Sequence, residues 1–121
     1  MELPIIGEHL TVRSSDPLLI IEAGEYELHI EGELAVHDPS AQTLHRIPGE
    51  PHTDELVQAL DGEITYAAAT SDGQLRIDLD SGQRLVVEPD RFFEAWTVTA
   101  PGRYLVVCMP GGELAVWSQE S

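Results

Sequence analysis

Residues 74–117 read QLRIDLDSGQRLVVEPDRFFEAWTVTAPGRYLVVCMPGGELAVW, and this stretch decides the fold class. Apolar and polar residues alternate through it, which is the period of a β-strand with one buried face. Asp-Ser-Gly, Pro-Gly and Pro-Gly-Gly sequences interrupt the alternation at short intervals, as turns do. The stretch also holds both tryptophans, both phenylalanines and the single cysteine. It predicts a run of short strands joined by tight turns.

The same alternation, working outward, predicts strands on the amino-terminal side over residues 10–14, 18–22, 25–33 and 33–37. Residues 38–52 are rich in Ser, Pro, Gln, Gly and His, so they are predicted to form a mobile loop. Residues 53–62 predict one short helix, with Thr53 as its N-cap and Gly62 as its stop. Strands return over residues 63–70, 75–79, 84–88, 96–100, 103–109 and 113–117, with one helical turn expected over residues 91–95.

The two halves of the chain resemble each other. Residues 7–31 and 62–88 share a series of Gly, Leu/Ile-Thr, Ser-Asp and alternating aliphatic positions, and GELAVH at 32–37 matches GELAVW at 112–117. Duplicated three-stranded meanders are one interpretation; chance similarity between alternating segments is the other. The expected fold is a mainly β, single domain with one short helix, whose antiparallel meanders form a small sandwich or half-barrel. Its parts are a first meander (1–37), a loop (38–52), a helix (53–62) and a second meander with closing strands (63–121).

Charge is the unusual feature of the composition. Twenty-two acids face six bases, all arginine, for a formal net charge of −16. Such a field repels nucleic acid and anionic membranes, so neither is expected as a partner, and it attracts cationic proteins. The alternative is that the acids only keep the protein soluble. The single cysteine and the lack of a secretory signal or long apolar run predict a cytoplasmic protein.

The acidic segment from residue 25 to residue 33 supplies the predicted partner-binding surface. Its alternation places five polar side chains on one face, about 7 Å apart along the strand. Two aspartates from residues 78–80 would widen the patch if they lay on a neighbouring strand. We interpret it as a docking surface for an Arg/Lys-rich protein, against the alternative of a solvated strand face. The predicted residues are Glu25, Glu27, His29, Glu31, Glu33, Asp78 and Asp80.

Other chemical features are weaker. Phe92, Phe93 and Trp96 could line a ligand pocket or close the end of a β core. Cys108 has apolar neighbours, which favours a buried, inert thiol over a nucleophile. The five histidines show no metal-binding spacing, so no metal or other cofactor is expected. Asp90, Glu94 or a histidine could serve a small hydrolase or lyase, but no catalytic motif is present, and the chain is predicted not to be an enzyme.

Two further strings carry a family resemblance. Residues 73–96, ending in PDRFFEAW, and residues 106–117, containing PGGELAVW, resemble an uncharacterised family of small acidic bacterial proteins. The start, MELPIIG, is similar too; Glu88 and Phe93 depart from the family's usual Pro and Tyr. The resemblance implies no enzyme activity and no catalytic residue. Such families are similar in size, acidity and β content to bacterial immunity proteins, which implies inhibition of a basic toxin domain. The alternative is a small-molecule or peptide-binding domain.

Overall fold

The computed structural model describes residues 1–40, 42–102 and 104–117. In that part of the chain, eleven antiparallel strands form one open sheet in the order β11-β10-β9-β3-β2-β1-β6-β7-β8-β4-β5. The strands are β1 (His9–Ser14), β2 (Leu19–Ala23), β3 (Tyr26–Ile30), β4 (Leu34–His37), β5 (Thr43–Arg46), β6 (Gly62–Ala69), β7 (Leu75–Leu79), β8 (Arg84–Val87), β9 (Trp96–Ala100), β10 (Tyr104–Cys108) and β11 (Leu114–Trp117). The mainly β prediction is confirmed.

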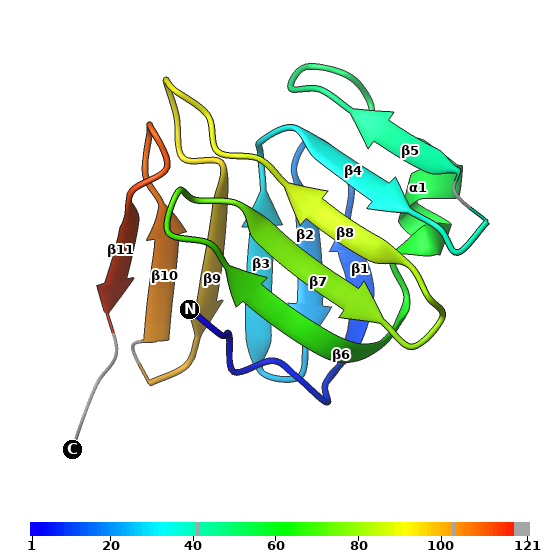
Figure 1. Ribbon diagram of the computed structural model, residues 1–121, viewed down its shortest axis with the longest axis horizontal. Helices are drawn as coiled ribbons and strands as arrows, with labels where there is room; N and C mark the ends of the chain where they lie inside the picture. Colours follow the sequence, from blue (N-terminus) through cyan, green and yellow to red (C-terminus); the bar gives the residue numbers. More distant parts are fainter. Residues whose placement is uncertain (41, 103, 118–121) are drawn as a thin grey trace.

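The sheet folds over itself into two layers. β1 and β6 join the layers through only two paired positions, His9–Glu63 and Leu10–Gly62. In Figure 1, β6, β7 and β8 lie in front of β1, β2 and β3; β4 and β5 extend the front layer, and β9 to β11 extend the rear layer. Alternate residues such as Leu28, Ile77 and Val98 are fully buried, so the core lies between the layers. The sheet does not close into a barrel.

The strand order is symmetric about the β1–β6 junction. The meander β1-β2-β3 lies on one side and the meander β6-β7-β8 on the other. β4 follows β3 but pairs with β8, and β9 follows β8 but pairs with β3, so each continuation crosses to the opposite layer. Duplication remains a prediction. The similar hexapeptides at 32–37 and 112–117 end in β4 and β11, which do not hold equivalent places in this order.

Three local predictions need correction. The predicted loop 38–52 contains β5, which pairs with β4 from Leu34–Arg46 to His37–Thr43. Its inward position carries an arginine, so the usual apolar signal is missing. The helix α1 (Asp54–Ala59) has the predicted cap, since Thr53 Oγ1 accepts a hydrogen bond from the Leu56 N–H at 3.2 Å, but Gly62 begins β6 and does not end the helix. Residues 91–93 form bends and no helical turn.

Residues 1–7 complete the fold. β6 leaves β1 after two paired positions, which would leave the rest of that edge exposed. The amino-terminal segment covers it, with the Leu3 N–H bonded to the Ala67 carbonyl at 2.9 Å and the Gly7 N–H to the Ile64 carbonyl at 2.8 Å. Leu3 and Ile5 are buried in the core. In the described residues, no helix is long and apolar enough to cross a membrane.

Candidate functional site

The seven residues of the predicted acidic surface do not lie on one face. Glu27 and His29 project from the outer face of β3, and Glu25 lies in the β2–β3 turn. Glu31 and Glu33 belong to the connection from β3 to β4. Asp78 lies on β7, with Asp80 just after it, in the other layer. The outer faces of packed layers point in opposite directions, so Asp78 cannot widen the β3 patch.

Basic side chains also compensate several of these acids. The Glu27 carboxylate accepts hydrogen bonds from His29 at 2.7 Å and from Arg13 at 2.5 Å, and these partners lower its pKa, with His29 the main cause. On the other layer, Asp78 accepts from two arginines. Glu33 lies 2.6 Å from the His45 ring. The uncompensated ladder of carboxylates expected from the sequence is therefore not formed, although partner binding by these residues remains a prediction.

The three aromatic residues of the predicted pocket have three different environments. Phe92 is 84% exposed, whereas Trp96 is 1% exposed and belongs to the core. The Trp96 indole N–H donates to the Gly73 carbonyl at 2.9 Å, which fixes the ring between the layers. Phe93 is half-buried and lines a cleft described below. Trp96 therefore fills the core, as the alternative interpretation held, and does not line a pocket with the two phenylalanines.

Cys108 lies in the core as expected. Its thiol is 3.4 Å from the Gly73 carbonyl, and burial raises the pKa of the thiol, so the reactive thiolate is disfavoured. A cluster of three or more His, Cys, Asp or Glu side chains suited to a metal ion does not occur in residues 1–40, 42–102 and 104–117.

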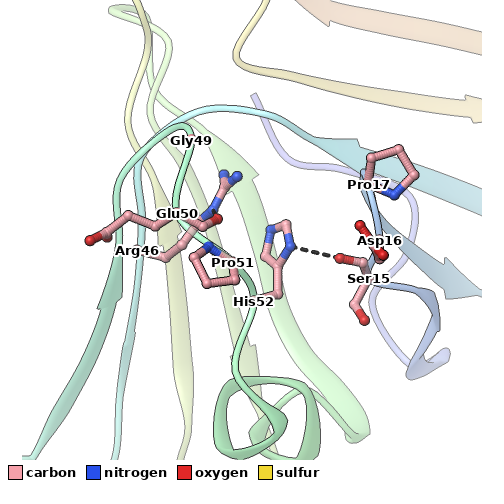
Figure 2. A pocket seen from close by; sticks show the side chains of 8 residues that line it. All are labelled: Ser15, Asp16, Pro17, Arg46, Gly49, Glu50, Pro51 and His52. Carbon is pink, nitrogen blue, oxygen red and sulfur yellow. Dashed lines mark hydrogen bonds between the residues drawn. The ribbon is translucent and has the colours of Figure 1, made fainter.

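A concave site lies elsewhere, between the β1–β2 turn and the connection from β5 to α1. Figure 2 shows this cleft, whose volume is about 480 Å³ and whose lining is Ser15, Asp16, Pro17, Arg46, Gly49, Glu50, Pro51 and His52. A second hollow of about 250 Å³ shares four of these residues, namely Pro17, Arg46, Gly49 and His52. It adds Leu18, Ile30, Glu31, Pro48 and Phe93. We call the two together the Arg46–His52 cleft.

Arg46 is the buried cation of this cleft. It is the last residue of β5 and only 9% exposed. Its Nε–H donates to the Glu50 carbonyl at 2.9 Å, while its Nη1 is buried without a hydrogen-bond partner in the described structure. Burial lowers the pKa of Arg46, and the Glu50 carboxylate opposes this shift. Among the described residues no carboxylate forms an ion pair with this guanidinium, so Nη1 remains a buried donor without a partner.

His52 supplies a matching acceptor. Its Nδ1 lies 2.8 Å from the Ser15 carbonyl, the dashed line in Figure 2. A carbonyl only accepts, so Nδ1 carries the proton and Nε2 of the neutral ring is an acceptor. Burial and, next, the Arg46 charge lower the pKa of His52; the Ser15 bond and Asp16 oppose them. Nε2 is buried and has no partner within the described part of the chain.

The arrangement is suited to recognition. It offers one charged donor, Arg46 Nη1, and one neutral acceptor, His52 Nε2, and both atoms are buried. Buried polar atoms of this kind are normally paired. In the described ranges no Ser, Thr or Cys side chain is hydrogen-bonded to His52, so no nucleophile–base pair is formed. Sequence reasoning missed this site because Arg46 and His52 lie in the predicted loop. One signal in the sequence could have indicated the site. Leu44 and Arg46 are two residues apart and share the inward face of β5, so an arginine stands where an apolar residue is usual.

Comparison with known proteins places the chain in a family. No curated protein and no solved structure matches it. One family model does match, over residues 1–118, and so over nearly all of the sequence. That match confirms the resemblance to an uncharacterised family. The chain belongs to DUF6188, a family of unknown function.

Proposed function

We propose that this chain is a non-catalytic binding protein and that the Arg46–His52 cleft holds its ligand. The observation that carries the proposal is the pair of buried, unpartnered atoms, Arg46 Nη1 and His52 Nε2, in one cleft. A buried polar atom without a partner costs about 1–3 kcal/mol. A ligand that pairs both atoms recovers this cost. The cleft volume of about 480 Å³ also lies in the range typical of small-molecule sites, roughly 300–1,000 Å³.

The frame around the cleft supports the same function. Arg46 is held by strand pairing with Leu34, and Nε is held by the Glu50 carbonyl. His52 is held by Ser15 and directly precedes the helix cap Thr53. Both groups are therefore oriented before a ligand arrives, which lowers the entropy cost of binding.

A thermal-shift screen tests the proposal. The probes are carboxylic acids, amino acids, amines, phosphates, sugars and nucleosides, each measured with the wild-type chain and with Arg46→Met. At least one class is expected to raise the melting temperature of the wild type, since a ligand at 100 times its Kd stabilises by about 2.7 kcal/mol. The shift should disappear in Arg46→Met and persist in Arg91→Met, which removes an exposed arginine outside the cleft lining. Shifts that are absent, or unchanged in Arg46→Met, would contradict the proposal.

A second candidate function is inhibition of a cationic protein, such as the basic domain of a toxin. The loops at one end of the molecule support this second function. The connections β3–β4, β6–β7, β8–β9 and β10–β11 meet there. Backbone bonds join these connections, from the Gly111 N–H to the Asp90 carbonyl at 2.7 Å and from the Glu31 N–H to the Ala95 carbonyl at 2.9 Å. Apart from Glu33, which pairs with His45, their acids form what we call the acidic loop end: Glu31, Asp72, Glu88, Asp90, Glu94 and Glu113.

Phe92 distinguishes this end from an ordinary acidic surface. Its ring is 84% exposed, and the Phe92 N–H is held by the Asp90 carboxylate at 2.8 Å. Aromatic side chains are frequent anchors of protein interfaces, and carboxylates around such an anchor raise the association rate of a basic partner.

Binding to a nona-arginine peptide separates this candidate from simple charge attraction. Glu31→Lys with Glu94→Lys should weaken the affinity at least tenfold more than Glu22→Lys with Glu63→Lys. Both pairs change the net charge by +4, but the second pair lies outside the acidic loop end. Equal losses would mean that only the net charge matters.

A further inference from the structure

We infer that the Arg46–His52 cleft binds a small amino carboxylate, of which a free α-amino acid with an apolar side chain is the simplest. The inference rests on the proposed function of the cleft and names its ligand class. Three properties of the lining carry it: a buried cation, an unpaired acceptor among carboxylates, and an apolar wall.

The buried cation calls for a carboxylate. A guanidinium removed from water is stabilised most by an anion that accepts its N–H groups. Arg46 is nine-tenths buried, and its Nη1 has no partner in the described residues. Figure 2 shows its guanidinium directed into the space between Gly49 and His52. Glu50 bonds Nε through its backbone carbonyl, and its carboxylate acts on Arg46 through space without an ion pair, so Nη1 stays available to a bound carboxylate.

His52 Nε2 and the carboxylates that line the cleft favour a ligand with an ammonium group beside its carboxylate. His52 Nε2 needs a donor, because Nδ1 holds the proton that bonds Ser15. Asp16 and Glu50 line the same cleft, and Glu31 lines the hollow that continues it. With one arginine against three carboxylates, the lining disfavours a dianion such as phosphate and favours a ligand with its own positive charge. An ammonium N–H donates to Nε2 and places that charge near the acids.

An apolar wall receives the rest of the ligand. Apolar residues form part of the lining of the second hollow: Pro17, Leu18, Pro48 and Phe93, together with Ile30, which is itself fully buried. It shares Arg46 and His52 with the main cleft, so a charged head at these two residues lies next to apolar side chains as well as to Glu31. Sites for small ligands combine an apolar lining with a few placed polar groups in this way.

Isothermal titration of the wild-type chain with L-leucine and L-phenylalanine tests the inference. Two analogues of L-leucine each lack one group: 4-methylpentanoate has no ammonium group and 3-methylbutylamine has no carboxylate. We expect an amino acid to bind and both analogues to bind at least tenfold more weakly. This comparison uses the unmodified chain, so it does not depend on the folding of a variant. Arg46→Met should then reduce amino acid affinity at least tenfold, with Arg91→Met as the matched control.

The outcomes separate the inference from the proposed function. Equal binding of L-leucine and 4-methylpentanoate overturns the amino carboxylate and leaves a ligand site for simple anions. Arg46-dependent binding of a different class, without any response to the amino acids, overturns the inference but not the proposed function. No Arg46-dependent binding of any probe class overturns both.

Discussion

At the scale of single residues, two glycines hold the layers together. Gly73, in the β6–β7 turn, has φ +97°, and a Cβ there would lie 2.6 Å from Gly112 Cα and from the Gly112 carbonyl oxygen. A Cβ at Gly112 would come even closer to the Asp72 carbonyl oxygen. The carbonyl of Gly73 also accepts from the Trp96 indole and lies within reach of the Cys108 thiol. One turn of the front layer is thereby fixed to two strands of the rear layer.

Gly73→Ala should therefore destabilise the fold strongly. A side chain at positive φ costs about 1–2 kcal/mol, and the contact with the Gly112 backbone adds to this because backbone cannot move aside cheaply. Gly102→Ala is the matched control, since Gly102 has φ +85° but nothing within 4 Å of the added Cβ. Urea unfolding should give a loss at least about 2 kcal/mol larger for Gly73→Ala than for Gly102→Ala. Similar losses for the two variants would show that the close approach of the turns is unimportant.

Individual residues were also where sequence reasoning was least complete. Cys108 was predicted to be buried, and Thr53 to cap the helix, because neighbouring residues determine both properties. Arg46 and His52 were missed because their importance depends on segments far away in the chain. The Ser15 carbonyl, which orients His52, lies 37 positions earlier. Whether a polar atom is buried without a hydrogen-bond partner depends on tertiary packing, so a local sequence pattern cannot predict it.

At the scale of elements, strand alternation was sufficient to predict ten of the eleven strands. β5 was missed, because Leu44 is the one apolar residue among its four. The sequence could not predict which strands pair with one another. For the same reason, the seven acidic-surface residues were wrongly expected to lie on one face. Period two tells which residues share a face of one strand, but not which layer that strand joins. Asp78 illustrates this, since it bridges β7 and β8 and has no contact with the acids of β3.

The Asp78 bridge predicts a pH-dependent contribution to stability. Burial alone would raise the pKa of Asp78, but hydrogen bonds from Arg76 at 2.9 Å and Arg84 at 3.0 Å outweigh it and hold the pKa below its ordinary value. A carboxyl with a lowered folded-state pKa stabilises the fold above its unfolded-state pKa, near 3.8, and loses this contribution as the pH falls through the folded-state value.

Asp78→Asn should thus cost about 1 kcal/mol at pH 7, a modest value because both arginines are partly exposed. The cost should shrink as the pH is lowered towards 3, in urea unfolding at each pH. Glu22→Gln, an exposed acid on the opposite layer, serves as the control for general charge effects. A cost that is the same at pH 7 and pH 3 would show that Asp78 acts through packing and not through its charge.

At the scale of the whole molecule, the net charge is spread over surfaces that face different directions. Glu22 and Glu27 are cross-strand neighbours on the rear layer, Asp78 and Glu63 belong to the front layer, and the acidic loop end adds more. At most six of the twenty-two acids can have an arginine of their own. Three of the six arginines form ion pairs within the described residues: Arg13, Arg76 and Arg84. Folding therefore brings uncompensated carboxylates closer together than they are in the unfolded chain.

Salt should for this reason stabilise the protein. The screening length falls from about 10 Å at 0.1 M salt to about 3 Å at 1 M, which weakens repulsion between acids on neighbouring strands. We expect sodium chloride to raise the melting temperature by roughly 4 °C between 20 mM and 500 mM, equivalent to about 1 kcal/mol. The pair Glu22→Lys with Glu63→Lys reduces the net charge to −12, so its melting temperature should rise less. A flat or falling response of the wild type would mean that pairs such as Glu27 with Arg13 already compensate the acids locally, and that the −16 charge costs the fold little.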